Sequence, residues 1–190
     1  MSKGRLEAFS DGVFAIIITI MVLDLRAPEG GDLAALRPLL PAFVGYVLSF
    51  AFVGIYWNNH HHLLQAAKQV NGRVLWANTH LLFWLSLIPF VTNWLGEHPG
   101  DIWPVVLYGL ALWLSGLAYY LLTRALVAQH GRESLLVQAL QRDSKGLVSL
   151  VIYTAAIALA FVDTRLSYGL YVLNALIWFV PDRRIESKLR

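Results

Sequence analysis

The sequence LEAFSDGVFAIIITIMVLDL, residues 6–25, is an almost unbroken apolar run near the start of the chain. A helix of about 20 residues, rising about 1.5 Å per residue, extends about 30 Å, which is the thickness of the hydrocarbon core of a bilayer. No water is available inside that core to satisfy backbone amides, so a crossing segment of this composition must be a helix. The run therefore predicts a transmembrane helix.

The composition of the whole chain supports the same interpretation. Of its 190 residues, 57% are hydrophobic and only 14% are charged, whereas a soluble domain usually carries about 25% charged residues. The chain has no cysteine, which excludes disulfides and thiolate metal sites. Its formal net charge is +3, but the charges lie between apolar runs and form no stripe, so we expect no nucleic-acid partner.

Six apolar runs follow one another along the chain. The last two are short, and the Asp163-Thr164-Arg165 turn between them is typical of a helical hairpin. The sequence therefore predicts a single all-α integral membrane domain, residues 1–190, with six transmembrane helices near residues 6–25, 38–64, 74–96, 103–128, 146–162 and 165–181.

The basic residues ahead of the first run also fit a secretory signal peptide. Asp11 interrupts the apolar run, however, and Ala27-Pro28 is a poor match to a small-x-small cleavage site. We therefore expect the segment to be retained as the first helix.

Lysine and arginine predict which side of the membrane each loop faces, because cytoplasmic loops carry an excess of both. If both termini lie in the cytoplasm, only three of the 15 basic residues lie outside, namely Arg26, Arg37 and Arg165. This asymmetry predicts an even number of spans with both termini cytoplasmic. The longest loop, about 129–145, is then cytoplasmic, and we interpret it as a short interfacial helix.

One face of the first helix carries bulky aliphatic side chains at helical spacing. At 100° per residue, a sector of about 100° contains Gly12, Ile16, Thr19, Ile20 and Leu23. Such a stripe is most often a core or lipid-facing surface.

Asp11 lies about 140° from Ile16 around the helix axis. A charge near the middle of a bilayer costs about 2.5–3.5 kcal/mol on insertion scales, so Asp11 needs partners. Polar groups at a similar predicted depth end the second run at Trp57-Asn58-Asn59-His60-His61-His62 and begin the third at Trp76-Ala77-Asn78-Thr79-His80, and Arg5 is a further candidate. We expect a polar network that holds the first helix against the second and third.

The three adjacent histidines raise the question of a metal site. His60, His61 and His62 point about 100° apart on a helix, so they cannot share one face. Hydrogen bonding is the simpler interpretation, and a pH-sensing role stays open because histidine titrates near neutral pH. We expect no metal and no cofactor.

The segment Arg5-x-x-x-Phe9-Ser10-Asp11, followed by Gly-Val-Phe-Ala-Ile, resembles the signature of the transmembrane protein 175 family of potassium channels. The stretch from Trp57 to His61, and Asn78 with Pro89-Phe90, are also similar to that family. The likeness covers the length and the six-run layout, and it is most specific in residues 5–25. Because the chain has no internal repeat, it resembles the bacterial members with one six-helix unit.

The resemblance implies a homotetrameric, potassium-selective leak channel of the cell membrane, with four first helices around a pore. It implies no carbonyl-lined filter, and the chain has no Thr-Val-Gly-Tyr-Gly segment. The family's hydrophobic constriction matches Ile16, Ile20 and Leu23, beside Gly12 and Thr19, and rings of such side chains gate by dewetting. The remaining motif positions, expected to form a structural network, are Arg5, Phe9, Ser10, Asp11, Trp57, His60, His61 and Asn78. Potassium ions and lipid are the expected partners, and no enzymatic activity is implied.

Two other classes of protein are open alternatives at the level of sequence. A proton-coupled secondary transporter would use Asp11 and His60–His62 as a relay, although the chain lacks the internal repeats and broken helices common in transporters. A membrane enzyme with a histidine-bound metal is disfavoured by the spacing of the histidines.

Overall fold

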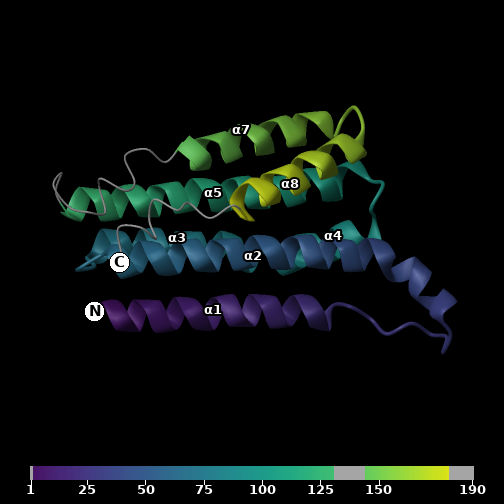
Figure 1. Ribbon diagram of the computed structural model, residues 1–190, viewed down its shortest axis with the longest axis horizontal. Coiled ribbons are helices and arrows are strands. Elements are labelled where there is room, and N and C mark those ends of the chain that lie inside the picture. The colour runs from purple at the N-terminus through teal and green to yellow at the C-terminus, as the bar shows by residue number, and fades with distance from the viewer. Residues whose placement is uncertain (1, 131–143, 180–190) are drawn as a thin grey trace.

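The computed structural model describes residues 2–130 and 144–179, and every regular element in these two ranges is helical. Figure 1 shows the long helices lying side by side, with α1 on one edge of the bundle and the α7–α8 hairpin on the opposite edge. The elements are α1 (Lys3–Leu23), the 3-10 helix η1 (Leu33–Leu39), α2 (Leu40–Ala66), α3 (Gly72–Ser86), α4 (Ile88–Glu97), α5 (Ile102–His130), α7 (Ser144–Leu159) and α8 (Thr164–Phe179). Most of the predicted interfacial helix at 129–145 lies outside the described residues.

Four helical stretches of the described chain are long and apolar enough to cross a membrane: Lys3–Leu23, Leu33–Ala66, Gly72–Glu97 and Ile102–Gln129. The predicted hairpin is formed by α7 and α8, which have 16 residues each. A helix of that length extends only about 24 Å, less than the bilayer core of about 30 Å. The fold is therefore an all-helical, multi-pass bundle, while the count of six crossings stays a prediction.

The apolar run at 74–96 contains a kink. Pro89 lies in the first turn of α4, directly after the end of α3. Because proline has no backbone N–H, it cannot continue the hydrogen-bond pattern of a helix interior. The amide of Leu87 instead closes the end of α3 by donating to the Trp84 carbonyl at 3.2 Å. The two helices still form one apolar stretch of 26 residues.

The core of the bundle centres on α5, which packs against α3, α4, α7 and α8. In contrast, α1 packs against α2, α3 and α4 through a single narrow stripe. The buried residues of that stripe are Leu6, Ser10, Phe14, Ile17 and Met21, spaced three or four apart as one helix face requires. The rest of the α1 surface is largely left without a partner in the single chain.

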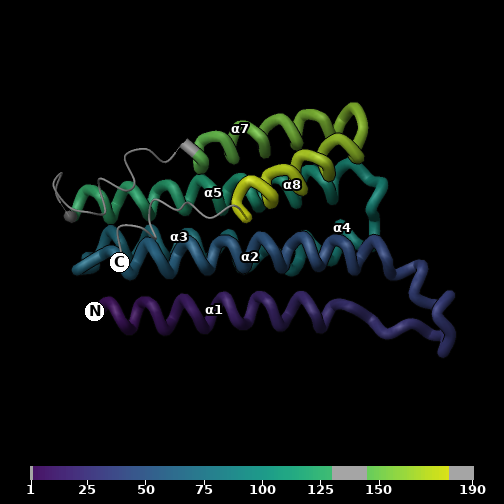
Figure 2. Tube along the Cα trace, in the orientation of Figure 1, coloured from purple at the N-terminus to yellow at the C-terminus, as the bar shows by residue number. Residues whose placement is uncertain are grey.

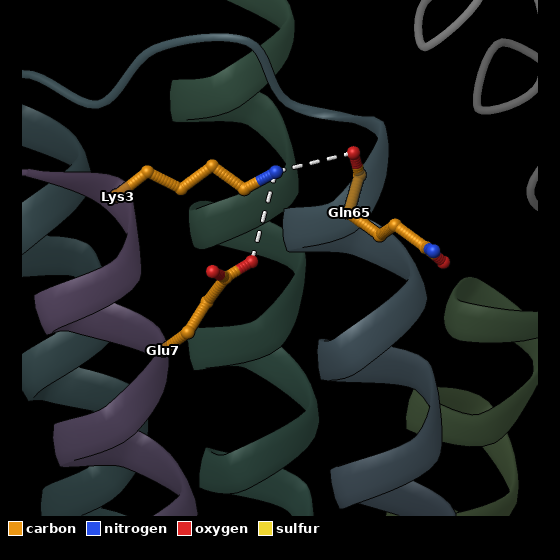
Figure 3. Close-up of polar contacts among 3 residues, drawn as sticks. All are labelled: Lys3, Glu7 and Gln65. Atoms are coloured by element: carbon orange, nitrogen blue, oxygen red, sulfur yellow. Dashed lines mark hydrogen bonds and ion pairs between the residues drawn. The ribbon is translucent and has the colours of Figure 1, made fainter.

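The N-terminal end of α1 is tied to the C-terminal end of α2. Lys3 Nζ donates to the backbone carbonyl of Gln65 at 3.2 Å and lies 3.6 Å from Glu7 Oε1 (Figure 3). The last carbonyls of a helix have no partner within the helix and carry partial negative charge, so a lysine there is favourable. Because the ion pair is partly exposed, it contributes about 0–1 kcal/mol, and its main effect is to position α1.

A close backbone contact between α2 and α4 gives a first test of the packing. A Cβ added to Gly96 would lie 2.7 Å from Ala42 Cα, which is backbone and cannot move aside alone. We expect Gly96→Ala to lower the free energy of unfolding by about 1–3 kcal/mol, measured by thermal unfolding of the purified protein. The control is Gly169→Ala in α8, where nothing lies within 4 Å of the added Cβ. Equal shifts in the two variants would contradict the close contact.

Candidate functional site

The aliphatic stripe predicted on α1 is exposed in the single chain. Ile16, Ile20 and Leu23 are 58%, 43% and 79% exposed, and Phe9 is 57% exposed. Their helix is nevertheless held firmly, because its other face is buried against α2, α3 and α4. The structure thus separates α1 into a packed face and an unpartnered aliphatic face.

Gly12 and Thr19 also lie on the exposed surface of α1. Nothing lies within 4 Å of a Cβ added to Gly12, so no contact within the single chain requires glycine there. The Thr19 hydroxyl lies 2.9 Å from the Ile16 carbonyl and 3.1 Å from the Ala15 carbonyl, and it donates back to its own helix. A hydroxyl that donates in this way keeps acceptor capacity on its oxygen, which faces away from the bundle with the rest of the residue.

A buried hydrogen-bond chain joins α1, α2 and α3. Asn78 Nδ2 donates to Ser10 Oγ at 3.0 Å, and Asn78 Oδ1 lies 2.7 Å from His60 Nε2. Since an amide oxygen only accepts, His60 must carry a proton on Nε2. The Ser10 hydroxyl in turn donates to the Leu6 carbonyl at 2.8 Å. The side chains of Ser10, His60 and Asn78 are at most 1% exposed, so water cannot compete for these hydrogen bonds. The hydrogen bonds therefore hold α1 against α2 and α3.

Asp11 makes a separate contact. Its carboxylate accepts a hydrogen bond from the Trp57 indole Nε1 at 2.9 Å, and both side chains are exposed. Of the partners that the sequence offered for Asp11, the structure pairs it with Trp57 at the end of the second run, and among the described residues no ion pair or hydrogen bond joins it to a histidine or to Arg5. Residues next to each other on a helix point 100° apart, so burying Ser10 turns Asp11 toward the flank of α2, where Trp57 lies.

Several residues expected in the network lie outside the buried hydrogen bonds through Asn78. Arg5 and Phe9 are exposed, while the ring of His61 stacks on Trp57 with centroids 6.1 Å apart. His80 accepts a hydrogen bond from a tryptophan one turn further along its own helix. The described residues contain no group of three or more histidine and acidic side chains arranged to hold a metal.

A second buried polar contact was not foreseen from the sequence. Ser49 Oγ lies 2.7 Å from Thr92 Oγ1 and 3.0 Å from Tyr108 Oη, which links α2, α4 and α5. Hydroxyl side chains inside apolar runs are a signal for such contacts, because they commonly join helices within membranes. The signal does not say which helices are joined.

The contact between Asp11 and Trp57 can be tested by a double-mutant cycle. We expect Asp11→Ala and Trp57→Phe each to lower the free energy of unfolding by about 0.5–1.5 kcal/mol, since each removes one partly exposed hydrogen bond. The double variant should lose no more than the larger single loss. Thermal unfolding in one detergent measures all four proteins, and fully additive losses would show that the two side chains do not interact.

Together, these features define a polytopic helical membrane protein, with one helix packed on one face and open on its opposite, aliphatic face. A model of the family described as the endosomal/lysosomal potassium channel TMEM175 matches residues 5–89. A potassium channel of Chryseobacterium sp. (strain P1-3) is 52% identical over 190 residues, which cover 100% of this chain and 99% of that relative. This chain therefore belongs to the TMEM175 family, whose members are ion channels and not enzymes.

Two further relatives show how the fold and the length of this chain compare with those of other family members. The crystal structure of a lysosomal potassium-selective channel TMEM175 homolog from Chamaesiphon minutus matches with a TM-score of 0.83 at 26% identity, covering 94% of this chain and 96% of that one. The human endosomal/lysosomal proton channel TMEM175 is 30% identical over 91% of this chain, but this chain spans only 39% of the human protein. The fold is thus that of a short member of the family.

Proposed function

We propose that this protein is a potassium-selective leak channel of the cell membrane, assembled as a homotetramer with four copies of α1 around the pore. The observation that carries the proposal is the unpartnered face of α1, where Ile16, Ile20 and Leu23 are exposed while the opposite face is packed. A four-fold axis beside that face brings each of the three positions together as a ring. The ion is suggested by the relatives, which are named potassium channels.

In this arrangement the three rings form a hydrophobic constriction. Branched aliphatic side chains offer an ion no substitute for its hydration shell, so a narrow ring opposes the passage of water and ions together. Gly12 and Thr19 lie on the same surface, so they flank the rings. The buried chain through Ser10, Asn78 and His60 holds α1 in the position that the rings require.

The proposed topology has six crossings with both termini in the cytoplasm. It is supported by the α7–α8 hairpin and by the charge pattern of the sequence, in which only Arg26, Arg37 and Arg165 of the 15 basic residues fall in loops that this topology places outside. Tilted neighbours or local thinning of the bilayer accommodate two helices of 16 residues each.

A liposome flux assay tests the proposed function directly. Purified protein is reconstituted under an outward potassium gradient, with sodium in a parallel arm, and its tetrameric state is verified by size-exclusion chromatography with light scattering. We expect downhill potassium flux that exceeds sodium flux. Folded, tetrameric protein that passes no potassium would refute the channel.

Proton permeation by the same route is a second candidate, favoured by the name of the human relative, a proton channel. A pH-sensitive dye inside the same liposomes measures it. The geometry gives no support to the proton-coupled transporter, because His60 pairs with Asn78 whereas Asp11 pairs with Trp57. Potassium accumulation against its own gradient, driven by an imposed proton gradient, would nevertheless favour the transporter over the channel.

A further inference from the structure

A small cavity lies between the C-terminal end of α1, the first half of α2, and α4. Its volume is about 20 Å³, and its polar lining consists of Asp24, Tyr46, Thr92 and Asn93. About 10–15 Å³ of such space is enough for one water molecule. The cavity therefore admits a water or a small ion, and it excludes an organic ligand.

The cavity is on the packed side of α1, because Met21 of the buried stripe also lines it. Figure 2 shows α1 ending beside the bundle before the chain continues past it toward η1 and returns into α2. The cavity is thus separate from the exposed aliphatic face that we assign to the pore.

Three polar side chains that line the cavity bond to no other protein group among the described residues, and none of them is fully buried: Asp24 is exposed, and Tyr46 and Asn93 are half-buried. Within residues 2–130 and 144–179, the Asp24 carboxylate forms no ion pair, and the Asn93 amide and the Tyr46 hydroxyl form no hydrogen bond. The fourth, the Thr92 hydroxyl, is 2.7 Å from Ser49 Oγ and keeps further acceptor capacity. Carboxylate, amide and hydroxyl oxygens are the donors that hard cations prefer.

The position of Asp24 independently points to a cation. Asp24 is the C-cap of α1, and the last turn of this helix contains no basic residue. A helix C-terminus carries roughly half a negative elementary charge, so an exposed carboxylate there, such as Asp24, is unfavourable by about 0.3–1 kcal/mol, which a bound cation offsets. One carboxylate balances one positive charge, whereas calcium usually gathers six to eight oxygens with several carboxylates.

We propose that this cavity binds one alkali cation, K⁺ or Na⁺, away from the pore, through Asp24, Asn93 and Tyr46. The bound cation joins the end of α1 to α2 and α4 and neutralises the charge at the helix terminus. Binding of the cation does not depend on the proposed function. Its consequence, a more stable pore-lining helix, rests on the proposed function.

Thermal unfolding of the full chain in lipid nanodiscs tests the site. The salt is KCl, NaCl or N-methyl-D-glucamine chloride at equal ionic strength, which separates the two cations from general screening. We expect a saturable rise of the unfolding midpoint with K⁺ or Na⁺, about 3–6 °C at ten times the dissociation constant. Asp24→Asn should abolish the rise, and Glu29→Gln, in the following loop and outside the cavity, should keep it. A rise that persists in Asp24→Asn, or none in the unchanged protein, overturns the proposal.

Tyr46→Phe is a second variant for the case that Asp24→Asn fails to fold. It removes one hydroxyl and keeps the ring contacts with Phe43 and Phe50, whose centroids lie 6.3 and 6.1 Å away. We expect the cation affinity to fall about two- to tenfold, as the loss of one oxygen contact implies. An unchanged affinity contradicts the assignment of Tyr46 as a ligand.

Thallium, which replaces K⁺ and scatters anomalously, locates the cation. Crystals grown with Tl⁺ should show an anomalous peak between Asp24 and Asn93, and an ordered water alone would give none. Potassium flux in liposomes without this peak rejects the cation site and leaves the channel standing. An anomalous peak without potassium flux supports the cation site and rejects the channel.

Discussion

Replacing Ile16 by serine is expected to raise ion flux at least about tenfold and to lower the potassium-to-sodium ratio. In a tetramer each substitution acts four times, so one apolar ring becomes a ring of four hydroxyls. Each hydroxyl that replaces part of an ion's or a water's hydrogen bonding contributes about 0.5–1.5 kcal/mol. The summed effect on the barrier is a few kcal/mol, and each 1.4 kcal/mol is about a tenfold change in rate.

The comparison needs an equally exposed aliphatic residue that is remote from α1. Val151 on α7 is 69% exposed, against 58% for Ile16, and Val151→Ser is the matched control. Flux and ion ratio are measured in liposomes for both variants and for Leu23→Ser. An ion ratio that stays at its original value in both α1 variants would show that the aliphatic stripe does not line the pore.

Replacing Asn78 by alanine is expected to produce the largest loss of stability. The Asn78 amide is the middle member of the buried chain, with Ser10 Oγ at 3.0 Å and His60 Nε2 at 2.7 Å. Its removal leaves His60 and Ser10 without that partner where water cannot replace it, and each such group costs about 1–3 kcal/mol. We expect a total loss of about 2–6 kcal/mol, which lowers the unfolding midpoint by roughly 4–24 °C.

Thr79→Ala provides the control for this prediction. Thr79 is next to Asn78 on α3, is exposed, and bonds only to the Leu75 carbonyl of its own helix at 3.0 Å. We expect its midpoint to change by less than about 2 °C, as for most exposed substitutions. Similar shifts of the midpoint in the two variants would mean that the hydrogen bonds of Asn78 contribute little to stability. Potassium flux of Asn78→Ala, measured well below its midpoint, then reports whether the anchor also positions the aliphatic stripe.

Much of the fold follows from local patterns. The apolar runs predicted the long helices because a crossing helix needs an apolar segment of a certain length, which can be counted along the chain. The Asp163-Thr164-Arg165 turn predicted the hairpin of α7 and α8, and the Arg165 amide indeed donates to Asp163 Oδ1 at 2.9 Å in that turn. The span predicted at 74–96 is divided into α3 and α4 at Pro89, because a proline cannot continue a helix interior.

The polar site was less predictable. Ser10, Asp11, His60, His61, Asn78 and His80 have a similar predicted depth in the membrane, and this depth alone is compatible with many different pairings. Which of them meet depends on how each helix is rotated about its axis and on how closely α2 and α3 approach α1. These quantities are set by packing across the whole bundle, to which the local sequence of one helix contributes little.

The sequence by itself determined that this chain is a bundle of apolar helices and that α1 has an aliphatic face, because hydropathy and the helical period are properties of neighbouring residues. The tertiary structure decided that the α1 face bearing Ser10 is buried and that Asp11 reaches Trp57 instead of a histidine. It also brought Asp24, Tyr46 and Asn93, which are far apart in the chain, to one cavity. Such contacts arise only when separate helices pack side by side.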